Sequence, residues 1–513
     1  MKKITQILFI FITLVLINSC SKFDEFNTNP DVPTTVTPEM LATQIMKDAY
    51  RFWNPNATDF GTGNLWAKHI VMLETNPNPY QYYYSYSPYG GFGGLQKIPA
   101  LNQMAEFAVG SPTEFSFKGL ALFMKASSAF GMVLEMGDIP YSEAGKAKEG
   151  ITKPKYDKSV DVFTQILADL KEAEGNFANG KAFGGDIMYG GDPVKWRRLC
   201  NAYQLKVIQT ISKKATAAQK ARFAEIVTAN NLLTEADNYQ LVYTTNTNAS
   251  HPYFDGENRR ILTAVSDLVV DFLKANNDRR LFYFAEPAKY KTDAGLTESD
   301  FNAYEGAPTQ LDADKLALNK NAGKYSLVNK RYTLKRDGDP MLRFTYAEEC
   351  FILAEAAEEG WISGGSAAAK TYYENGVKAI LKYYMTLPSA TAANLHGMAI
   401  TQAYIDGYFT GEAAYKTDGS KAERLKQIIT QRWLIDFFQG NELFGYKTFL
   451  RTGYPAFPLD PNTSMNPDDK NVYPKRWKYP TSELTTNPEN YLKAVQEQYD
   501  GYDGINKVPW WLQ

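Results

Sequence analysis

The chain has 513 residues, of which 44% are hydrophobic and 22% charged, so it is long and apolar enough to bury a large core. Its 55 Lys and Arg residues nearly balance its 57 Asp and Glu residues, giving a formal net charge of −2. This balance excludes a strongly basic nucleic-acid-binding protein, and we expect no nucleic-acid partner. The 34 Tyr, 29 Phe and 8 Trp residues are compatible with a ring-rich binding surface and with an aromatic core.

The N-terminus has a secretory pattern. The basic start Met1 to Lys3 is followed by an apolar run, Ile7 to Ile17, which is shorter than the ~20 residues of a membrane-spanning helix. The run ends in Ile-Asn-Ser before Cys20, which resembles a bacterial lipobox, where the signal is cleaved and the cysteine is lipidated. Several acyl chains on one cysteine anchor a protein stably. We predict a signal peptide over 1–19 and lipidation, including palmitate, at Cys20. The alternative is an ordinary cleaved signal peptide.

A polar tether is expected next. Segment 20–38 is rich in Asn, Pro and Thr, which is typical of an extended linker. The acidic pair Asp24 and Glu25 resembles the export signal of some Gram-negative lipoproteins. We therefore expect a lipid-anchored protein in the outer membrane that faces the cell exterior. No linker divides the remaining chain, and we predict a single domain over 39–513.

Helical periodicity dominates this part of the chain. Apolar residues recur at i, i+3, i+4 and i+7, the pattern of a helix with one buried face. It predicts helices over 115–135, 157–174, 196–211, 261–274, 343–361 and 424–439. Asp157 is the expected capping residue of the second helix, and Tyr239 to Thr245 is the best candidate for a strand. The sequence therefore predicts a mainly α fold.

Long stretches rich in Gly, Pro and Asn separate these helices. They cover 74–99, 175–195, 285–340 and 452–490. Loops of this length are uncommon unless they are functional or disordered, and their aromatic content favours order. The pattern indicates a helical scaffold with large ordered loops, and helix pairs at this density are compatible with a tetratricopeptide-like stack.

Cysteines and histidines give little sign of catalysis or metal binding. Cys200 and Cys350 lie among apolar positions at helical spacing, so we expect buried free thiols, with a disulfide as the alternative in an oxidising compartment. The histidines His69, His251 and His396 lack the spacing of a metal site, and we expect neither a metal nor a cofactor.

Carboxylates also argue against an enzyme. Glu348 and Glu349 are adjacent on a predicted helix and point about 100° apart, so they are poorly placed for acid–base work across one glycosidic bond. We predict that the protein is not an enzyme. Carboxylates distant in sequence leave a surface-anchored glycan hydrolase as an alternative.

Six segments form an ordered set of motifs along the chain. They are FNTNPDVP after the lipobox, GDIPYSEA at 137–144, WRRLCNAYQLKVIQTIS at 196–212, LRFTYAEECFILAEAAEEGW at 342–361, QRWLIDFFQGNELFGYKTFLRTGYP at 431–455 and KRWKYPTSELTTNPENY at 475–491. Together they resemble the SusD/RagB family of nutrient-binding outer-membrane lipoproteins, in its SusD-like branch. The resemblance implies four tetratricopeptide-like helix pairs with an irregular, loop-rich ligand region. It also implies a partner, a SusC-type TonB-dependent outer-membrane transporter over which the lipoprotein forms a lid.

Most residues of these motifs are expected to be structural. Asp138, Pro140 and Glu143 fit a turn that caps helices. Arg432, Glu442 and Arg451 fit buried ion pairs between packed helices. Direct ligand contact by these residues is the alternative.

The segment 77–94, PNPYQYYYSYSPYGGFGG, is the main candidate for a ligand site. It has six Tyr and one Phe among three Pro and four Gly, without the periodic Leu, Ile or Val of a core segment. Its irregular backbone can hold rings outward, and a tyrosine offers a ring face and a hydroxyl to a sugar. The alternative is that the rings pack the loop onto the scaffold or the transporter. The candidate ligand-binding residues are Tyr80, Tyr82, Tyr83, Tyr84, Tyr86 and Tyr89, with Trp53 and Trp66 upstream and with His251 and Tyr253 as a second candidate.

These features predict a cell-surface lipoprotein that captures oligosaccharides and passes them to the transporter for uptake. Oligopeptide capture, as in relatives of RagB, is the alternative with the same lid role. A structural lid without a ligand of its own is a further alternative.

Overall fold

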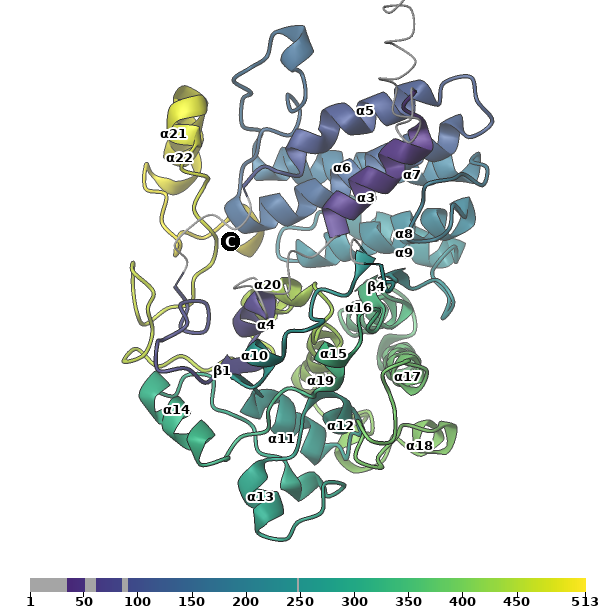
Figure 1. The fold of residues 1–513 in the computed structure, drawn as a ribbon. Helices are drawn as coiled ribbons and strands as arrows, with labels where there is room; N and C mark the ends of the chain where they lie inside the picture. Colours follow the sequence, from purple (N-terminus) through teal and green to yellow (C-terminus); the bar gives the residue numbers. More distant parts are fainter. Residues whose placement is uncertain (1–34, 51–60, 85–90, 247–248) are drawn as a thin grey trace, which may run out of the picture.

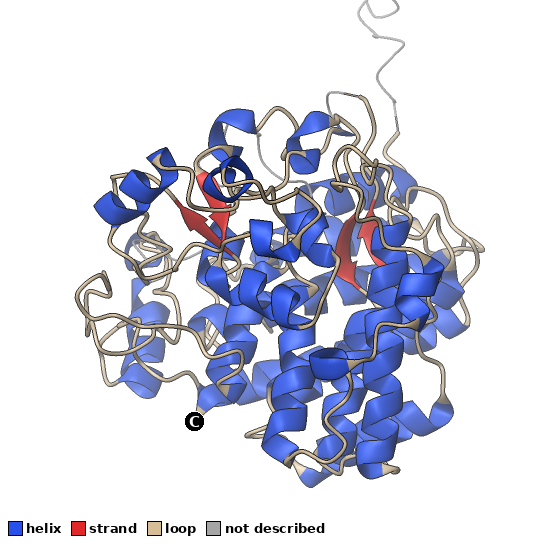
Figure 2. Cartoon of the chain, turned by 90° about the horizontal axis from the view of Figure 1, so that it is seen from below, coloured by secondary structure: helices blue, strands red, loops and turns tan. Residues whose placement is uncertain are grey.

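The computed structural model of the chain describes residues 35–50, 61–84, 91–246 and 249–513. Helices dominate these residues, with two small sheets among them (Figure 2). The first half contains α3 (Pro38–Tyr50), α4 (Thr62–Trp66), α5 (Ile98–Phe107), α6 (Glu114–Met136), α7 (Ser159–Ala178), α8 (Pro193–Thr210) and α9 (Ala217–Ala229). The second half contains α10 (Glu257–Arg260), α11 (Asp267–Ala275), α12 (Arg280–Phe284), α13 (Lys289–Asp293), α14 (Ala313–Asn321), α15 (Arg331–Leu334), α16 (Tyr346–Glu358), α17 (Gly365–Met385), α18 (Gln402–Asp406), α19 (Lys421–Leu434), α20 (Glu442–Thr452), α21 (Glu483–Thr486) and α22 (Pro488–Tyr499). Short 3-10 helices are η1 (Leu95–Lys97), η2 (Ala147–Glu149), η4 (Phe301–Ala303), η5 (Gly411–Ala413) and η6 (Trp510–Leu512).

Four pairs of helices form the scaffold of the described chain, and the two helices of each pair follow one another in the sequence. Helix α6 packs on α7, α8 on α9, α16 on α17 and α19 on α20. Contacts of α7 with α8, of α8 with α16 and of α16 with α19 join the pairs into one stack. Figure 1 shows α5 to α9 in its upper half and α16, α17 and α19 below them. The mainly α, tetratricopeptide-like fold expected from the sequence is confirmed.

Helix α6 illustrates how the apolar pattern places a helix in the core. Its Phe123, Phe130 and Val133 are fully buried, as expected from the helical spacing of apolar residues over 115–135. By length and hydropathy, α6 is the one helix of the described chain that is suited to crossing a membrane, but 67% of its apolar window is buried inside the protein. We therefore assign it to the core of the scaffold.

The predicted cap of α7 is wrong. The helix begins at Ser159 after Lys158, and the carboxylate of Asp157 instead accepts hydrogen bonds from the amide and hydroxyl of Ser142, both at 2.7 Å. Oδ1 of Asp138 accepts from the amide of Ser159 at 2.7 Å and from its hydroxyl at 2.8 Å. Asp138, which is distant in sequence, thus accepts from the free amide of Ser159 at the start of the helix. Closeness in sequence alone does not decide which carboxylate reaches that amide.

The two sheets are short antiparallel pairs. Strand β1 (Ile70–Met72) pairs with β3 (Thr263–Val265), and β2 (Tyr239–Leu241) pairs with β4 (Met341–Phe344). The prediction of a strand from 239 to 245 is therefore correct in its position, but the observed strand β2 ends at Leu241, four residues before the predicted end.

Several predicted boundaries need correction. The segment 343–361 divides into the end of β4 and helix α16, whose cap Thr345 accepts from the amide of Glu348. The segment 261–274 divides into β3 and α11, because Ser266 caps the helix. Helix α19 ends at Leu434, five residues before the predicted end. The expected loop 285–340 contains helices α13, α14 and α15.

Candidate ligand-binding site

The segment 77–84, here called the tyrosine loop, leaves β1 and forms a compact turn. The amide of Tyr84 donates to the carbonyl of Pro79 at 2.8 Å, and the amide of Tyr80 donates to the side chain of Asn78 at 3.0 Å. Figure 1 shows the loop on the side of the molecule that also carries α14 and C-terminal segments. A Pro and Asn turn of this kind fixes an irregular backbone without regular secondary structure.

Tyr83 anchors the loop in the protein core. Its side chain is 0% exposed, and its hydroxyl donates to the carbonyl oxygen of Pro458 at 2.7 Å. Its ring packs edge-on against Tyr473 and tilted against Trp66. Its backbone has a φ of +63°, in the left-handed region that bulky residues rarely adopt. Such a conformation costs ~1–3 kcal/mol and persists only where the surroundings fix it, as this buried ring does.

A buried lysine supports the same turn. Lys68 is fully buried, and its ammonium donates to the carbonyl oxygen of Gln81 at 2.5 Å and lies 3.7 Å from the centroid of the Tyr83 ring. Burial lowers the pKa of Lys68 well below its usual value, because no carboxylate compensates the loss of hydration. The side chain of Gln81 accepts from the amide of Met72 at 2.8 Å and so ties the loop to β1.

Tyr82 joins the loop to two distant segments. Its hydroxyl donates to the carbonyl of Leu311 at 2.6 Å, just before α14, and its own carbonyl accepts from the amide of Met465 at 2.7 Å. The hydroxyl of Thr463 donates to the carbonyl of Gln310 at 3.1 Å and links these two segments to each other. Burial raises the pKa of the Tyr82 phenol to about 12, so the hydroxyl remains a donor at physiological pH.

The structure separates the predicted aromatic residues into two groups. Tyr80 and Tyr84 are half-buried and keep part of their surface at the protein exterior. Trp66, Tyr82 and Tyr83 are buried, so the prediction that their rings face outward is wrong. They pack the loop onto the scaffold, the alternative that the sequence had left open. Ligand contact by Tyr80 and Tyr84 stays a prediction, and Trp53, Tyr86 and Tyr89 lie outside the described residues.

The second candidate, His251 with Tyr253, is part of the core. Both side chains are buried, and the ring of His251 packs against those of Tyr243 and Tyr253. Nδ1 of His251 accepts from the amide of Tyr253 at 3.2 Å. Burial lowers the pKa of His251 to about 4, so the ring is neutral at physiological pH. Both side chains thus pack in the core, and ligand contact by this pair stays a prediction.

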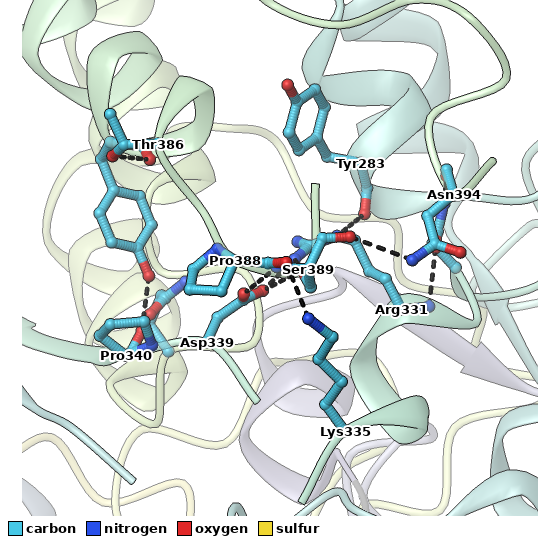
Figure 3. A network of polar contacts seen from close by, with 12 residues as sticks. Tyr283, Arg331, Lys335, Asp339, Pro340, Thr386, Pro388, Ser389 and Asn394 are labelled. Atoms are coloured by element: carbon cyan, nitrogen blue, oxygen red, sulfur yellow. Dashed lines mark hydrogen bonds and ion pairs between the residues drawn. The ribbon is translucent and has the colours of Figure 1, made fainter. Parts of the chain in front are cut away.

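A buried polar network lies beside His251, and its Arg331 and Asp339 line the same small cavity as the histidine. Arg331 pairs with Asp339 and donates to the hydroxyl of Ser389 at 2.9 Å and to the carbonyl of Tyr283 at 2.7 Å (Figure 3). The hydroxyl of Ser389 donates to Asp339 at 2.7 Å. Because each charged group has a partner, the network is compatible with a role in holding the 329–340 and 386–394 segments together.

The motif residues expected to be structural have structural contacts. Glu143 accepts from the amide of Lys155 at 2.8 Å. Arg432 pairs with Glu348 at 3.2 Å, and Arg451 pairs with Glu355 through Nη2 and Oε2 at 2.9 Å. The expected ion pairs between helices are thus present, with both acidic partners on α16, while the side chain of Glu442 lies outside the described residues.

Thiols and carboxylates are catalytic groups in many enzymes, but those considered from the sequence are buried in the scaffold of this protein. Cys200 and Cys350 are buried free thiols, as predicted. Glu348 contacts Arg432 and Lys206, whereas Glu349 accepts from the amide of Leu233, so the two adjacent carboxylates point to different neighbours. Across the described ranges, no group of three or more His, Cys, Asp or Glu side chains is placed to hold a metal ion.

Sequence patterns did not reveal the segments around 310 and 463 that complete the site. Both are Pro-containing loops without periodicity, and their contacts with the tyrosine loop cross more than 200 residues. The expected loop-rich region at 285–340 and 452–490 was the one available signal.

Comparison with known proteins gives a consistent result. The SusD-like family model, described as starch-binding and associating with the outer membrane, matches residues 30–480. A SusD homologue from Bacteroides fragilis is 35% identical with a TM-score of 0.86, and the match covers 93% of this chain and 100% of that chain. A protein from Bacteroides vulgatus, described in terms of the outer membrane and nutrient binding, is 30% identical with a TM-score of 0.82 and the same coverage.

More distant proteins share the fold alone. A chitin-binding SusD homologue from Flavobacterium johnsoniae is 19% identical with a TM-score of 0.72, and the match covers 93% of this chain and 98% of that one. A comparison with curated protein sequences finds no match. The family match over most of the chain, together with relatives of at least 30% identity, shows that this chain belongs to the SusD-like family of outer-membrane-associated proteins, which bind nutrients and are not enzymes.

Proposed function

We propose that this protein captures oligosaccharides at the cell surface and passes them to a SusC-type TonB-dependent transporter. The observation that carries the proposal is the tyrosine loop, in which buried Tyr82 and Tyr83 fix the backbone while Tyr80 and Tyr84 are only half-buried. The starch-binding description of the family model and the chitin-binding name of one structural relative support a glycan as the ligand.

The chemistry of the loop suits sugar binding. A tyrosine ring stacks on the C–H face of a sugar, and its hydroxyl exchanges hydrogen bonds with the sugar's rim of OH groups. Because the backbone is fixed before binding, little conformational entropy is lost when the rings engage. We expect affinities that are micromolar or weaker, since a capture protein must release its cargo to the transporter. A nanomolar complex that does not exchange would contradict this expectation.

Anchoring and transfer form the second part of the proposal. Cys20 would carry the lipid, and 20–38 would act as the tether that ends where α3 begins at Pro38. Residues 39–513 would fold as one domain that acts as a lid over the transporter at the exterior face of the outer membrane. The joined helix stack supports the single domain, and the lipobox motif supports the anchor.

A titration panel tests the function. The mature chain without its lipid, residues 21–513, is titrated calorimetrically with starch-derived and chitin-derived oligosaccharides, other glycans and mixed peptides. Saturable heat with one glycan class supports the proposal. Binding of peptides alone favours the oligopeptide alternative, and new reducing ends during incubation would indicate a hydrolase. Silence across the panel, with transporter association retained, favours a lid without its own ligand.

A further inference from the structure

A cleft of about 320 Å³ lies in the helical scaffold and shares no lining residue with the tyrosine loop. It is formed where α8, α16 and α20 end and α9 begins, with one side of α19 as a further wall. Its volume is at the lower end of small-ligand pockets, which span ~300–1,000 Å³. The cleft therefore has room for one or two sugar rings.

A buried ion pair between Arg451 and Glu355 lines the cleft. Arg451 and Glu355 each have 6% of the side chain exposed and form a two-bond contact, with Nη2 and Oε2 at 2.9 Å. At the rim, Glu359 pairs with Lys421 at 2.9 Å. The two acidic residues of the lining are thus neutralised by their own partners.

Two lysines of the lining are left without an acidic partner. Within the described chain, neither Lys213 nor Lys220 forms an ion pair, and the ammonium of Lys213 donates to the carbonyl of Leu512 at 3.3 Å. The charge of Lys213 also contributes, after burial, to the lowered pKa of the neighbouring Lys475. An anion placed beside Lys213 would offset this repulsion between like charges.

An aromatic wall stands beside these charges. The ammonium of Lys220 lies 5.1 Å from the centroid of the Trp361 ring, and that ring packs edge-on against buried Phe223 at 5.5 Å. The edge-on packing fixes the orientation of the half-buried indole. Tyr454 contributes a second ring to the lining. The cleft therefore combines a rigid ring surface with unpaired positive charge.

We propose that this cleft is a second ligand site, which binds a carboxylate-bearing sugar, a hexuronate unit. The carboxylate lies between Lys213 and Lys220, and the face of the sugar ring lies against Trp361. The inference does not depend on the tyrosine loop, because the two sites have no residue in common.

The probe is digalacturonate, with its dimethyl ester as a neutral partner of the same ring structure. Residues 21–513 are titrated with each probe at low and high salt, following heat and tryptophan fluorescence. We expect saturable binding of digalacturonate that weakens with salt, and at least tenfold weaker binding of the ester.

Charge variants locate the site. Lys213→Gln with Lys220→Gln should weaken digalacturonate binding at least tenfold, whereas Lys214→Gln, which removes one neighbouring charge outside the lining, should leave it unchanged. The proposal is overturned if digalacturonate does not bind, if the double variant binds as the parent does, or if Lys214→Gln weakens binding equally. Equal binding of succinate would overturn the assignment to a sugar. The variant Tyr80→Ala with Tyr84→Ala should bind digalacturonate normally, which separates this test from that of the tyrosine loop.

Discussion

The hydroxyl of Tyr83 donates a 2.7 Å hydrogen bond to the carbonyl oxygen of Pro458, 375 residues further along the chain. This contact joins a loop near the N-terminus to a segment near the C-terminus. Together with the bond from Tyr82 to Leu311, it fixes the backbone from which Tyr80 and Tyr84 extend. The buried rings of the loop therefore have an anchoring role, and ligand contact by the half-buried Tyr80 and Tyr84 stays a prediction.

Two replacements of Tyr83 should lower the free energy of unfolding, and the second should lower it more than the first. Tyr83→Phe leaves the Pro458 carbonyl without its donor and should cost about 1 kcal/mol in the free energy of unfolding. Tyr83→Ala also removes a fully buried ring and should cost about 3–5 kcal/mol. Urea unfolding of the three proteins measures both effects. Equal stability of all three would show that the ring does not anchor the loop.

Loss of a charge from the buried cluster around Glu348 should lower the free energy of unfolding more than loss of a charge from a surface ion pair. Glu348 contacts the ammonium of Lys206 at 3.0 Å and the guanidinium of Arg432 at 3.2 Å, and all three side chains are less than 10% exposed. Glu348→Gln leaves two buried cations without their counter-charge and should cost about 3–5 kcal/mol.

A matched control is the exposed pair of Lys289 and Asp293, with side chains that are 75% and 61% exposed. Asp293→Asn should change the free energy of unfolding by less than about 0.5 kcal/mol, because an exposed pair is screened by solvent. Both changes are measured by urea unfolding at pH 7. A cost for Glu348→Gln as small as that of the control would contradict a role for the cluster in stability.

Stability should fall with rising pH because of Glu349. Burial raises the pKa of its carboxyl from 4.5 to about 8, so the folded state holds a proton that the unfolded chain has released. The group's contribution is fully present below about pH 4.5 and is lost as pH rises towards 8, with a slope of at most ~1.4 kcal/mol per pH unit. Glu349→Gln keeps the shape of the side chain and removes this titration.

Urea unfolding at pH 5 and pH 8 isolates this group. The parent should lose more stability between the two values than Glu349→Gln does. Parallel losses in the two proteins would mean that the carboxyl of Glu349 ionises alike in the folded and unfolded chains.

The regular helices were predictable because their signal is local. The stripe that includes Phe123 and Phe130 has helical spacing, and α6 begins and ends within one residue of the predicted bounds. The cap of α7 was not predictable, since Asp138 lies 21 residues before Ser159 and only the tertiary structure brings the two residues together. The predicted strand was too long because its partner β4 has only four residues.

The tyrosine loop shows where sequence reasoning reaches its limit. Composition located a ring-rich segment, but a loop without periodicity gives no way to tell buried rings from exposed ones. Two of the partners that bury Tyr83, the ring of Tyr473 and the carbonyl of Pro458, lie more than 370 residues away in sequence. Only the structure could therefore distinguish the half-buried Tyr80 and Tyr84 from the buried tyrosines of the loop.

The most direct test of the account compares glycan affinity in three proteins. The oligosaccharide that binds in the titration panel is titrated calorimetrically into residues 21–513, into the double variant Tyr80→Ala with Tyr84→Ala, and into Tyr372→Ala. Tyr372 is a matched control, a half-buried tyrosine on α17. We predict that the double variant binds at least tenfold more weakly, a loss of ~1.4 kcal/mol or more, while Tyr372→Ala binds as the parent does. Unchanged affinity in the double variant would contradict capture by the tyrosine loop.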